Sequence, residues 1–192
     1  EHVSSSYYRS FFKKRGVGLA TVRAGNIIGG GDWSTDRLIP DAVKAWSQNE
    51  RLQIRSPQAT RPWQHVLEPL SGYLTLAENL WNEPDKISGP WNFSPDQNNI
   101  KTVQDTVELA VQIWGSSASW ELTSDSDLHE ASLLQLNSEK AKSILKWKPR
   151  WDFDKAVSET ILWYKKYYSR TQNMLDTTLN QISEYEDQTV NV

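Results

Sequence analysis

The fold follows from two neighbouring stretches of sequence, VGLATV at residues 17–22 and GNIIGGGDW at residues 25–33. The first is a short run of small and branched apolar residues between Gly16 and Arg23, which is typical of a strand covered on both faces of a parallel sheet. The second is too rich in glycine to be regular structure, and apolar residues at helical spacing follow it from about residue 38 to residue 48. A strand, a loop and a helix in this order predict an α/β fold built on a parallel sheet.

Regular elements are predicted on both sides of this unit. Val3, Tyr7 and Phe11 recur at helical spacing and predict a helix before the first strand. Further elements are expected as strands at 52–54, 63–66, 89–93 and 120–122, and as helices at 69–80, 102–114, 137–145 and 153–168. Residues 1–168 therefore form the expected folded part. Residues 169–192 are polar without a sustained period and are expected to be a loosely held tail.

Charge and hydropathy limit the possible classes of protein. The 192-residue chain has 21 Lys and Arg against 24 Asp and Glu (21 − 24 = −3), and its mean hydropathy is −0.65. This balance disfavours binding to nucleic acid or to an anionic membrane, and no apolar run approaches the ~20 residues that cross a bilayer. The absence of cysteine excludes disulfides, thiolate catalysis and Cys-ligated metals. We expect a cytoplasmic chain of one domain or part of one, and the first residue, Glu1, predicts an N-terminus made by truncation or processing.

The loop at residues 25–33 allows two interpretations. Three consecutive glycines after a strand let the backbone approach a ligand closely and leave N–H groups free to bind it. The same composition also suits a plain flexible turn. The spacing does not match G-x-G-x-x-G before a helix, so the loop is not a dinucleotide fingerprint.

Two arginines are candidate phosphate ligands. Arg61 stands beside Pro62 and Trp63, which would hold its guanidinium in one direction, and a fixed planar guanidinium suits bidentate binding of phosphate. An arginine in such a position also suits a surface ion pair, and the spacing alone favours this simpler role. Arg55, just after a short predicted strand, allows the same two roles.

The histidines give no support for a catalytic or metal site. His65 lies in an apolar context and is expected to be a core histidine, and the three histidines, at positions 2, 65 and 129, have no metal-ligand spacing. No G-x-S-x-G elbow is present, so hydrolase chemistry has no support.

Ten tryptophans could form a platform for stacking sugars, as in a carbohydrate-binding module. Eight of them, however, lie in predicted elements or caps among apolar partners, and core packing is expected for these: Trp46, Trp63, Trp81, Trp91, Trp114, Trp147, Trp151 and Trp163.

Several strings of sequence resemble those of one enzyme family. They are VRAGNIIGGGDW at 22–33, DRLIPD at 36–41, RPWQHVLE at 61–68, GPWNF at 89–93, HEASLLQL at 129–136, KA at 140–141 and WKP at 147–149. In this order they resemble the second half of an extended short-chain dehydrogenase/reductase acting on nucleotide sugars, and they are most similar to the CDP-glucose 4,6-dehydratase branch. The resemblance covers about residues 1–168. It implies the C-terminal part of a doubly wound, Rossmann-type parallel sheet with a smaller α/β lobe that binds substrate.

The resemblance also implies site residues. It matches Arg23, Ala24 and Gly25 with the strand end that passes beside the nicotinamide of NAD. The residues implied to contact the nucleotide sugar are Asn26 at the diphosphate, Arg37 and Leu38 at a helix start that meets phosphate, Arg61 at phosphate, Arg55 beside the base and Glu130 at the ribose. One departure is Lys146, where related sequences commonly carry Gly, and it puts only the local turn in doubt.

The activity that the resemblance implies is NAD-dependent. The sugar of CDP-glucose is oxidised at C4, water is lost across C5 and C6, and hydride returns to C6, giving CDP-4-keto-6-deoxyglucose for deoxysugar and surface-polysaccharide synthesis. The Tyr-x-x-x-Lys and the glycine-rich NAD motif of this family are absent from the sequence. We therefore assign no catalytic residue and no metal ligand, and expect this chain alone to be inactive.

The resemblance further implies that the full protein is a homodimer. Two other functions remain open, a different nucleotide-sugar epimerase or dehydratase of the same superfamily, and a non-enzymatic nucleotide-sugar-binding protein. A carbohydrate-binding module is the third alternative function.

Overall fold

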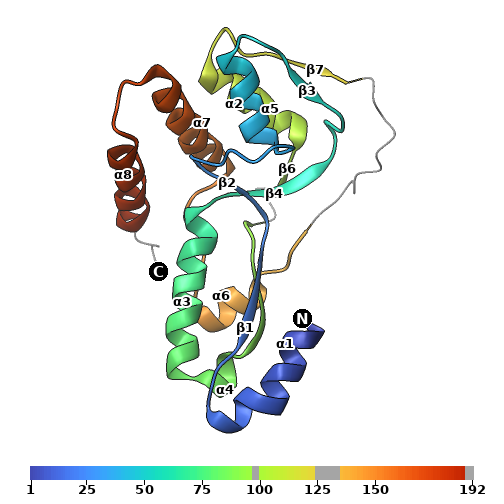
Figure 1. Ribbon diagram of the computed structural model, residues 1–192, viewed down its shortest axis with the longest axis vertical. Helices are drawn as coiled ribbons and strands as arrows, with labels where there is room; N and C mark the ends of the chain where they lie inside the picture. The colour runs from blue at the N-terminus through green and yellow to red at the C-terminus, as the bar shows by residue number, and fades with distance from the viewer. Residues whose placement is uncertain (97–99, 124–134, 189–192) are drawn as a thin grey trace.

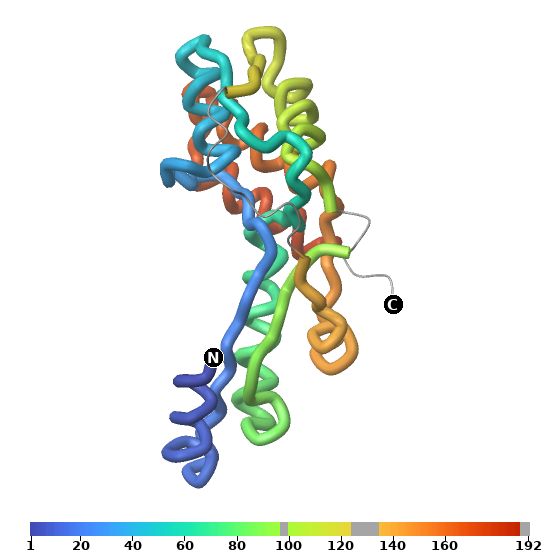
Figure 2. Tube along the Cα trace, turned by 90° about the vertical axis from the view of Figure 1, so that its right-hand side faces the viewer, coloured from blue at the N-terminus to red at the C-terminus, as the bar shows by residue number. Residues whose placement is uncertain are grey.

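A computed structural model describes residues 1–96, 100–123 and 135–188, and Figure 1 shows two regions along its long axis. The upper lobe contains β2 (Asn26–Ile28), α2 (Leu38–Ser47), β3 (Leu52–Ile54), β4 (Thr60–His65), β6 (Ile100–Thr102), α5 (Val103–Trp114), β7 (Trp120–Leu122), α7 (Phe153–Ser169) and α8 (Met174–Asp187). The lower limb contains α1 (His2–Tyr7), β1 (Ala20–Ala24), α3 (Leu67–Asn82), α4 (Pro84–Ile87), β5 (Gly89–Phe93) and α6 (Glu139–Leu145). Figure 2 shows the limb as a narrow extension of the lobe.

Local sequence signals explain where several helices begin and end. Thr102 and Asp105 cap the start of α5 reciprocally, each side chain accepting a hydrogen bond from the other residue's backbone N–H. The helical run that begins with α1 continues through short π and 3₁₀ turns and ends at Gly16, whose φ of +66° is left-handed. Lys146 ends α6 with a φ of +57°, so the turn that the resemblance put in doubt forms here with a side chain. None of the described helices is long and apolar enough to cross a membrane.

The strands pair mainly in parallel, as an α/β fold requires. β1 pairs with β5, β2 with β4, and β3 with β7, all in parallel, while β6 joins the other edge of β4 in antiparallel orientation. The β2–β4 register places Asn26 opposite Trp63, and the β4–β6 register places Arg61 opposite Lys101. The α/β fold class predicted from the sequence is therefore confirmed.

The first strand is less covered than its sequence predicted. β1 begins at Ala20 rather than at residue 17, and Val22 keeps 40% of its surface exposed. Helix α3 packs against β1, and a side chain at Gly18 would meet Leu80 of that helix. Val22 and Arg23 are both exposed, so the expectation of cover on both faces is wrong within this chain.

The two regions have separate cores. The core of the lobe packs α2, α5 and α7 over the strands and includes Trp46, Val107 and Ile161, whereas the smaller core of the limb is built around Phe93, Trp91 and Trp147. Core packing is confirmed for six of the predicted tryptophans, which are buried: Trp46, Trp63, Trp91, Trp147, Trp151 and Trp163. It is wrong for Trp81, which is 88% exposed near the end of α3.

Within the expected tail, residues 174–187 form α8, which packs on α7, so this part of the chain is not loosely held. Its buried face consists of Thr177, Gln181 and Tyr185, which recur at helical spacing but are polar. The Tyr185 hydroxyl donates to Glu68 at 2.9 Å, and Trp163 Nε1 donates to Thr178 Oγ1 at 3.0 Å. Apolar periodicity in the sequence cannot indicate a helix that docks through polar side chains. The boundary at residue 168 itself stays a prediction.

Candidate functional site

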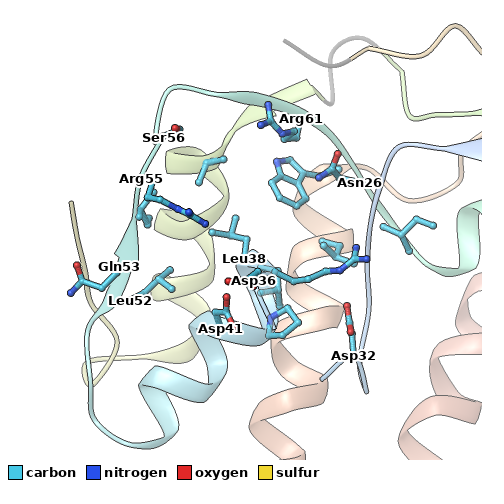
Figure 3. Close-up of a pocket in the computed structure, with 18 of the residues that line it drawn as sticks. Asn26, Asp32, Asp36, Leu38, Asp41, Leu52, Gln53, Arg55, Ser56 and Arg61 are labelled. Atoms are coloured by element: carbon cyan, nitrogen blue, oxygen red, sulfur yellow. The ribbon is translucent and has the colours of Figure 1, made fainter. Parts of the chain in front are cut away.

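A pocket of about 300 Å³ lies in the upper lobe between β2 and its loop, the start of α2, the segment around β3, and β4 (Figure 3). This volume is at the lower end of the range for small-molecule sites. Five of the six residues predicted to contact a nucleotide sugar line it: Asn26, Arg37, Leu38, Arg55 and Arg61. The sixth, Glu130, lies outside the described residues. The fold thus brings together residues from four separate elements, although their roles toward a ligand stay predictions.

Strand β4 places Arg61 in the pocket wall. Arg61 and Trp63 both line the pocket, as expected for residues two apart on a strand, and Pro62 between them is buried. The Arg61 side chain is half-buried, and its Nη1 donates to the carbonyl oxygen of Thr60 at 2.9 Å. The guanidinium is therefore held close to the backbone beside Asn26, which starts the neighbouring strand.

The start of α2 forms another wall. Arg37 is the N-cap residue in an extended conformation (φ −120°) and its side chain makes no capping hydrogen bond. The first backbone N–H groups of this ten-residue helix therefore have no side-chain cap. These groups and the positive end of the helix dipole favour an anion at this wall of the pocket.

Three aspartates line the same pocket and were not among the residues singled out from the sequence. For Asp32, burial acts to raise the pKa, but hydrogen bonds from Ser34 and the charge of Arg37 outweigh it, so the pKa is lowered. For Asp41, burial and then the nearby Asp36 carboxylate raise the pKa. Asp36 and Asp41 belong to the DRLIPD string, but only its arginine and leucine carried an implied role.

Trp63 adds an unmatched donor to the wall. Its side chain is 5% exposed, and its indole N–H has no hydrogen-bond acceptor among the described residues. A buried donor without an acceptor is uncommon, because burial costs it the hydrogen bond that it makes to water. The sequence indicated a core residue here, and its position opposite Asn26 emerges only from the strand pairing.

Close packing explains Gly29 and Gly30 of the 25–33 loop, whereas Gly31 has a left-handed φ of +83°. A side chain at Gly30 would overlap the indole ring of Trp163, and one at Gly29 would come within 2.8 Å of Val66. Neither glycine has the positive φ that only glycine adopts readily. Residues 30–31 form a turn, as one of the two interpretations had it, but the turn is closely packed. The loop is packed against α7 and lines the pocket at Gly29 and Asp32.

The residues predicted to lie beside NAD are not among those that line the pocket. Arg23 lies on β1, where its Nη1 donates to Asn92 Oδ1 at 2.9 Å and its guanidinium pairs with Glu1. Ala24 ends β1, and the Gly25 N–H donates to the carbonyl oxygen of Phe93 at 3.2 Å. A side chain at Gly25 would lie 2.5 Å from the carbonyl oxygen of Pro62. The three residues thus end the strand that leads directly into Asn26.

His65 is a core residue, as predicted, although it is not fully hydrogen-bonded. It is 2% exposed, its ring lies 4.7 Å from that of Trp151, and its Nε2 has no partner among the described residues. Burial lowers the pKa of His65 to about 4, so the imidazole is neutral at pH 7. The side chain does not line the pocket.

Comparison with curated sequences supports the resemblance inferred from the motifs. The chain is 45% identical over 190 residues to CDP-glucose 4,6-dehydratase of Salmonella typhimurium, covering 96% of this chain and 53% of the relative. The chain therefore spans about half the length of the curated relative that it matches. No protein-family model matches the chain.

Solved structures share the fold. UDP-glucuronic acid 4-epimerase of Bacillus cereus, solved with UDP-glucuronic acid and NAD, is 17% identical, with a TM-score of 0.72 over 87% of this chain and 50% of that structure. The dTDP-glucose 4,6-dehydratase of Bacillus anthracis, solved with NAD, is 21% identical, with a TM-score of 0.65 over 88% of this chain and 50% of that structure. The described chain therefore has the Rossmann-type α/β fold of part of these solved structures, and the predicted fold class is confirmed.

Proposed function

We propose that this chain forms the nucleotide-sugar-binding part of an NAD-dependent CDP-glucose 4,6-dehydratase. The observation that supports this most is the meeting of Asn26, Arg37, Leu38, Arg55 and Arg61 at one pocket, since the resemblance assigns all five to one ligand. The 45% identity to a CDP-glucose 4,6-dehydratase supports the ligand class. We assign the complete reaction to a protein that also contains the part of the relative that this chain does not cover.

The pocket suits the diphosphate of such a ligand. Arg37 and Arg61 line the pocket, and a guanidinium group can donate two parallel hydrogen bonds to phosphate oxygens. The first N–H groups of α2 offer further donors, and Asn26 offers an amide. The indole N–H of Trp63 remains an unmatched donor in the same wall. In this proposal these groups hold and orient the nucleotide sugar while the reaction proceeds at its sugar.

We assign Arg23, Ala24 and Gly25 to the nicotinamide side of the site. At Gly25 the end of β1 packs closely against Pro62, whose carbonyl oxygen would lie 2.5 Å from an added Cβ. NAD, when bound, supplies the hydride acceptor for oxidation at the sugar C4 and the hydride that returns to C6. The sequence has neither Tyr-x-x-x-Lys nor a glycine-rich dinucleotide motif, so the chain alone is expected to form no 4-keto sugar.

A nucleotide-sugar epimerase is the second candidate, and the likeness of fold to a solved UDP-sugar epimerase favours it. Both candidates use this pocket for a nucleotide diphosphate, and they differ in whether the product is a 4-keto-6-deoxy sugar or an epimer. A cytoplasmic location, a homodimer and a role in surface-polysaccharide synthesis are further parts of the proposal.

The test is the affinity for CDP, measured by calorimetry for the wild-type protein and for Arg61→Ala. Loss of one charge-assisted interaction with phosphate should weaken binding by about 1.5–3 kcal/mol, or roughly 10- to 100-fold in Kd. The matched control is Arg51→Ala, because Arg51 is exposed, pairs with Glu121 and does not line the pocket. Equal affinities of wild type and Arg61→Ala, or no CDP binding by wild type, would contradict the proposal.

A further inference from the structure

The loop between β2 and α2 is fastened to α7 at a residue that lines the pocket. The Tyr164 hydroxyl donates to the carbonyl oxygen of Asp32 at 2.6 Å, and Asp32 lines the pocket (Figure 3). Tyr164 is 0% exposed, and burial raises the pKa of its hydroxyl, which therefore keeps the proton that it donates. The ring of Trp33, the next residue of the loop, lies 5.3 Å from the ring of Tyr164. One core tyrosine thus holds the backbone of a pocket residue.

The Asp32 side chain connects this anchor to Arg37. Its Oδ1 accepts a hydrogen bond from the backbone N–H of Ser34 at 3.0 Å, which fixes the carboxylate relative to the loop. The positive charge of Arg37, which also lines the pocket, attracts the same carboxylate. The Arg37 side chain is exposed and makes no capping hydrogen bond, so its direction depends on nearby charge. Asp32 is therefore placed to orient Arg37.

A carboxylate at this wall is useful to a diphosphate only through the arginine. Two negative groups repel each other, so Asp32 by itself disfavours the ligand. A guanidinium donates its paired N–H groups in one plane, and its orientation decides whether both reach phosphate oxygens. Holding the guanidinium in advance also reduces the entropy that is lost when the ligand binds.

We propose that Tyr164 is a positioning residue for the nucleotide sugar, which holds Asp32 and thereby orients Arg37 toward the diphosphate. The inference rests on the proposed function, namely that the pocket binds a nucleoside diphosphate, and it adds a residue outside the pocket on which this binding depends. Tyr164 itself does not line the pocket, so its effect passes through the loop. Without the hydroxyl, the Asp32 carbonyl loses this donor while the packing of the loop against α7 remains.

The experiment is a double-mutant cycle on the affinity for CDP, measured by calorimetry for the wild-type protein, Tyr164→Phe, Arg37→Ala and the double variant. We expect Tyr164→Phe to raise the Kd about fivefold and Arg37→Ala to raise it about tenfold or more. In the Arg37→Ala background, Tyr164→Phe should raise the Kd less than about twofold, because the side chain through which it acts is gone. In the Arg61→Ala background, Tyr164→Phe should keep its effect of about fivefold.

The matched control is Tyr185→Phe. The Tyr185 hydroxyl is also buried, donates to Glu68 at 2.9 Å and lies outside the pocket. Tyr185→Phe therefore loses a comparable hydrogen bond without touching the loop, and it should leave the Kd for CDP unchanged. Thermal unfolding of each variant checks that the titrated protein is folded. Equal losses of affinity in Tyr185→Phe and Tyr164→Phe would assign the effect to general stability and overturn the inference.

The other outcomes separate this inference from the proposed function. If wild type binds CDP and Tyr164→Phe leaves the Kd unchanged, the inference is wrong and the proposed function stands. A fivefold loss that persists in the Arg37→Ala background also overturns the inference, since Tyr164 then acts without Arg37. If wild type does not bind CDP, the proposed function fails and this inference fails with it.

Discussion

The upper lobe and the lower limb differ in how completely their apolar surfaces are covered. In the lobe, α2, α5 and α7 close over the strands, and the pocket residues are fixed by elements that are buried on their inner faces. In the limb, β1 has one pairing partner among the described residues, and the outer face of α3 exposes Leu70, Leu74 and Trp81. The comparison indicates that the pocket lies in the region with the larger core.

One buried carboxylate joins the two regions. Glu68, in the first turn of α3, is 0% exposed and accepts hydrogen bonds from the backbone N–H groups of Arg150 and Trp151, which precede α7, and from the Tyr185 hydroxyl of α8. Burial raises the pKa of Glu68, while these three donors act in the opposite direction. The limb is thus attached to the lobe through a polar contact that is buried from water.

Removing this carboxylate should have the largest effect on stability. Glu68→Ala leaves buried backbone N–H groups without an acceptor, and we expect the free energy of unfolding to fall by about 4 kcal/mol, at roughly 1–3 kcal/mol for each such group. Urea unfolding followed by tryptophan fluorescence measures it. Glu68→Gln is the matched control, since its amide oxygen still accepts hydrogen bonds, and it should lose less. A loss below about 1 kcal/mol for Glu68→Ala would mean that the two regions are held together elsewhere.

Acidification should weaken the lobe through His65. Because burial lowers the folded-state pKa from 6.5 to about 4, the unfolded chain binds a proton between these values and the folded chain does not. The contribution of His65 is therefore fully present above pH 6.5 and is lost as pH falls toward 4, by up to about 3 kcal/mol. The free energy of unfolding should fall between pH 7 and pH 4.5, and it should fall more for wild type than for His65→Phe. The pKa of Glu68 is raised, so its contribution to stability increases as pH falls. Both proteins contain Glu68, and its contribution therefore cancels in the comparison.

The smallest effect is expected on the outer face of the limb. Trp81→Ser replaces a side chain that is 88% exposed, so the free energy of unfolding should change by no more than about 0.5 kcal/mol. Trp91→Ser, in the core of the same limb, serves as the contrasting variant and should lose several times more. A loss for Trp81→Ser that approaches that of Trp91→Ser would show that another surface covers α3, and the contrast between the two regions would disappear.

The sequence by itself determined most elements and the candidate pocket residues. Helices such as α5 follow from apolar spacing plus the Thr102–Asp105 cap, and these signals are local, lying within a few residues of each other. Arg61 could be selected because Pro62 and Trp63 adjoin it in a string that resembles a known family. The same kind of local reading failed for Trp81, because apolar neighbours in sequence do not show which face of a helix meets the core.

Only the tertiary structure decided the features that depend on contacts between distant residues. Helix α8 docks through Thr177, Gln181 and Tyr185, which have no apolar period, and the partner of Tyr185 lies 117 residues away at Glu68. Gly30 is required by the indole of Trp163, not by a turn, and Asp41 reaches the pocket because α2 packs beside β3. The physical reason is that periodicity and capping act over one or two turns of chain, whereas burial and pocket geometry depend on which elements pack together.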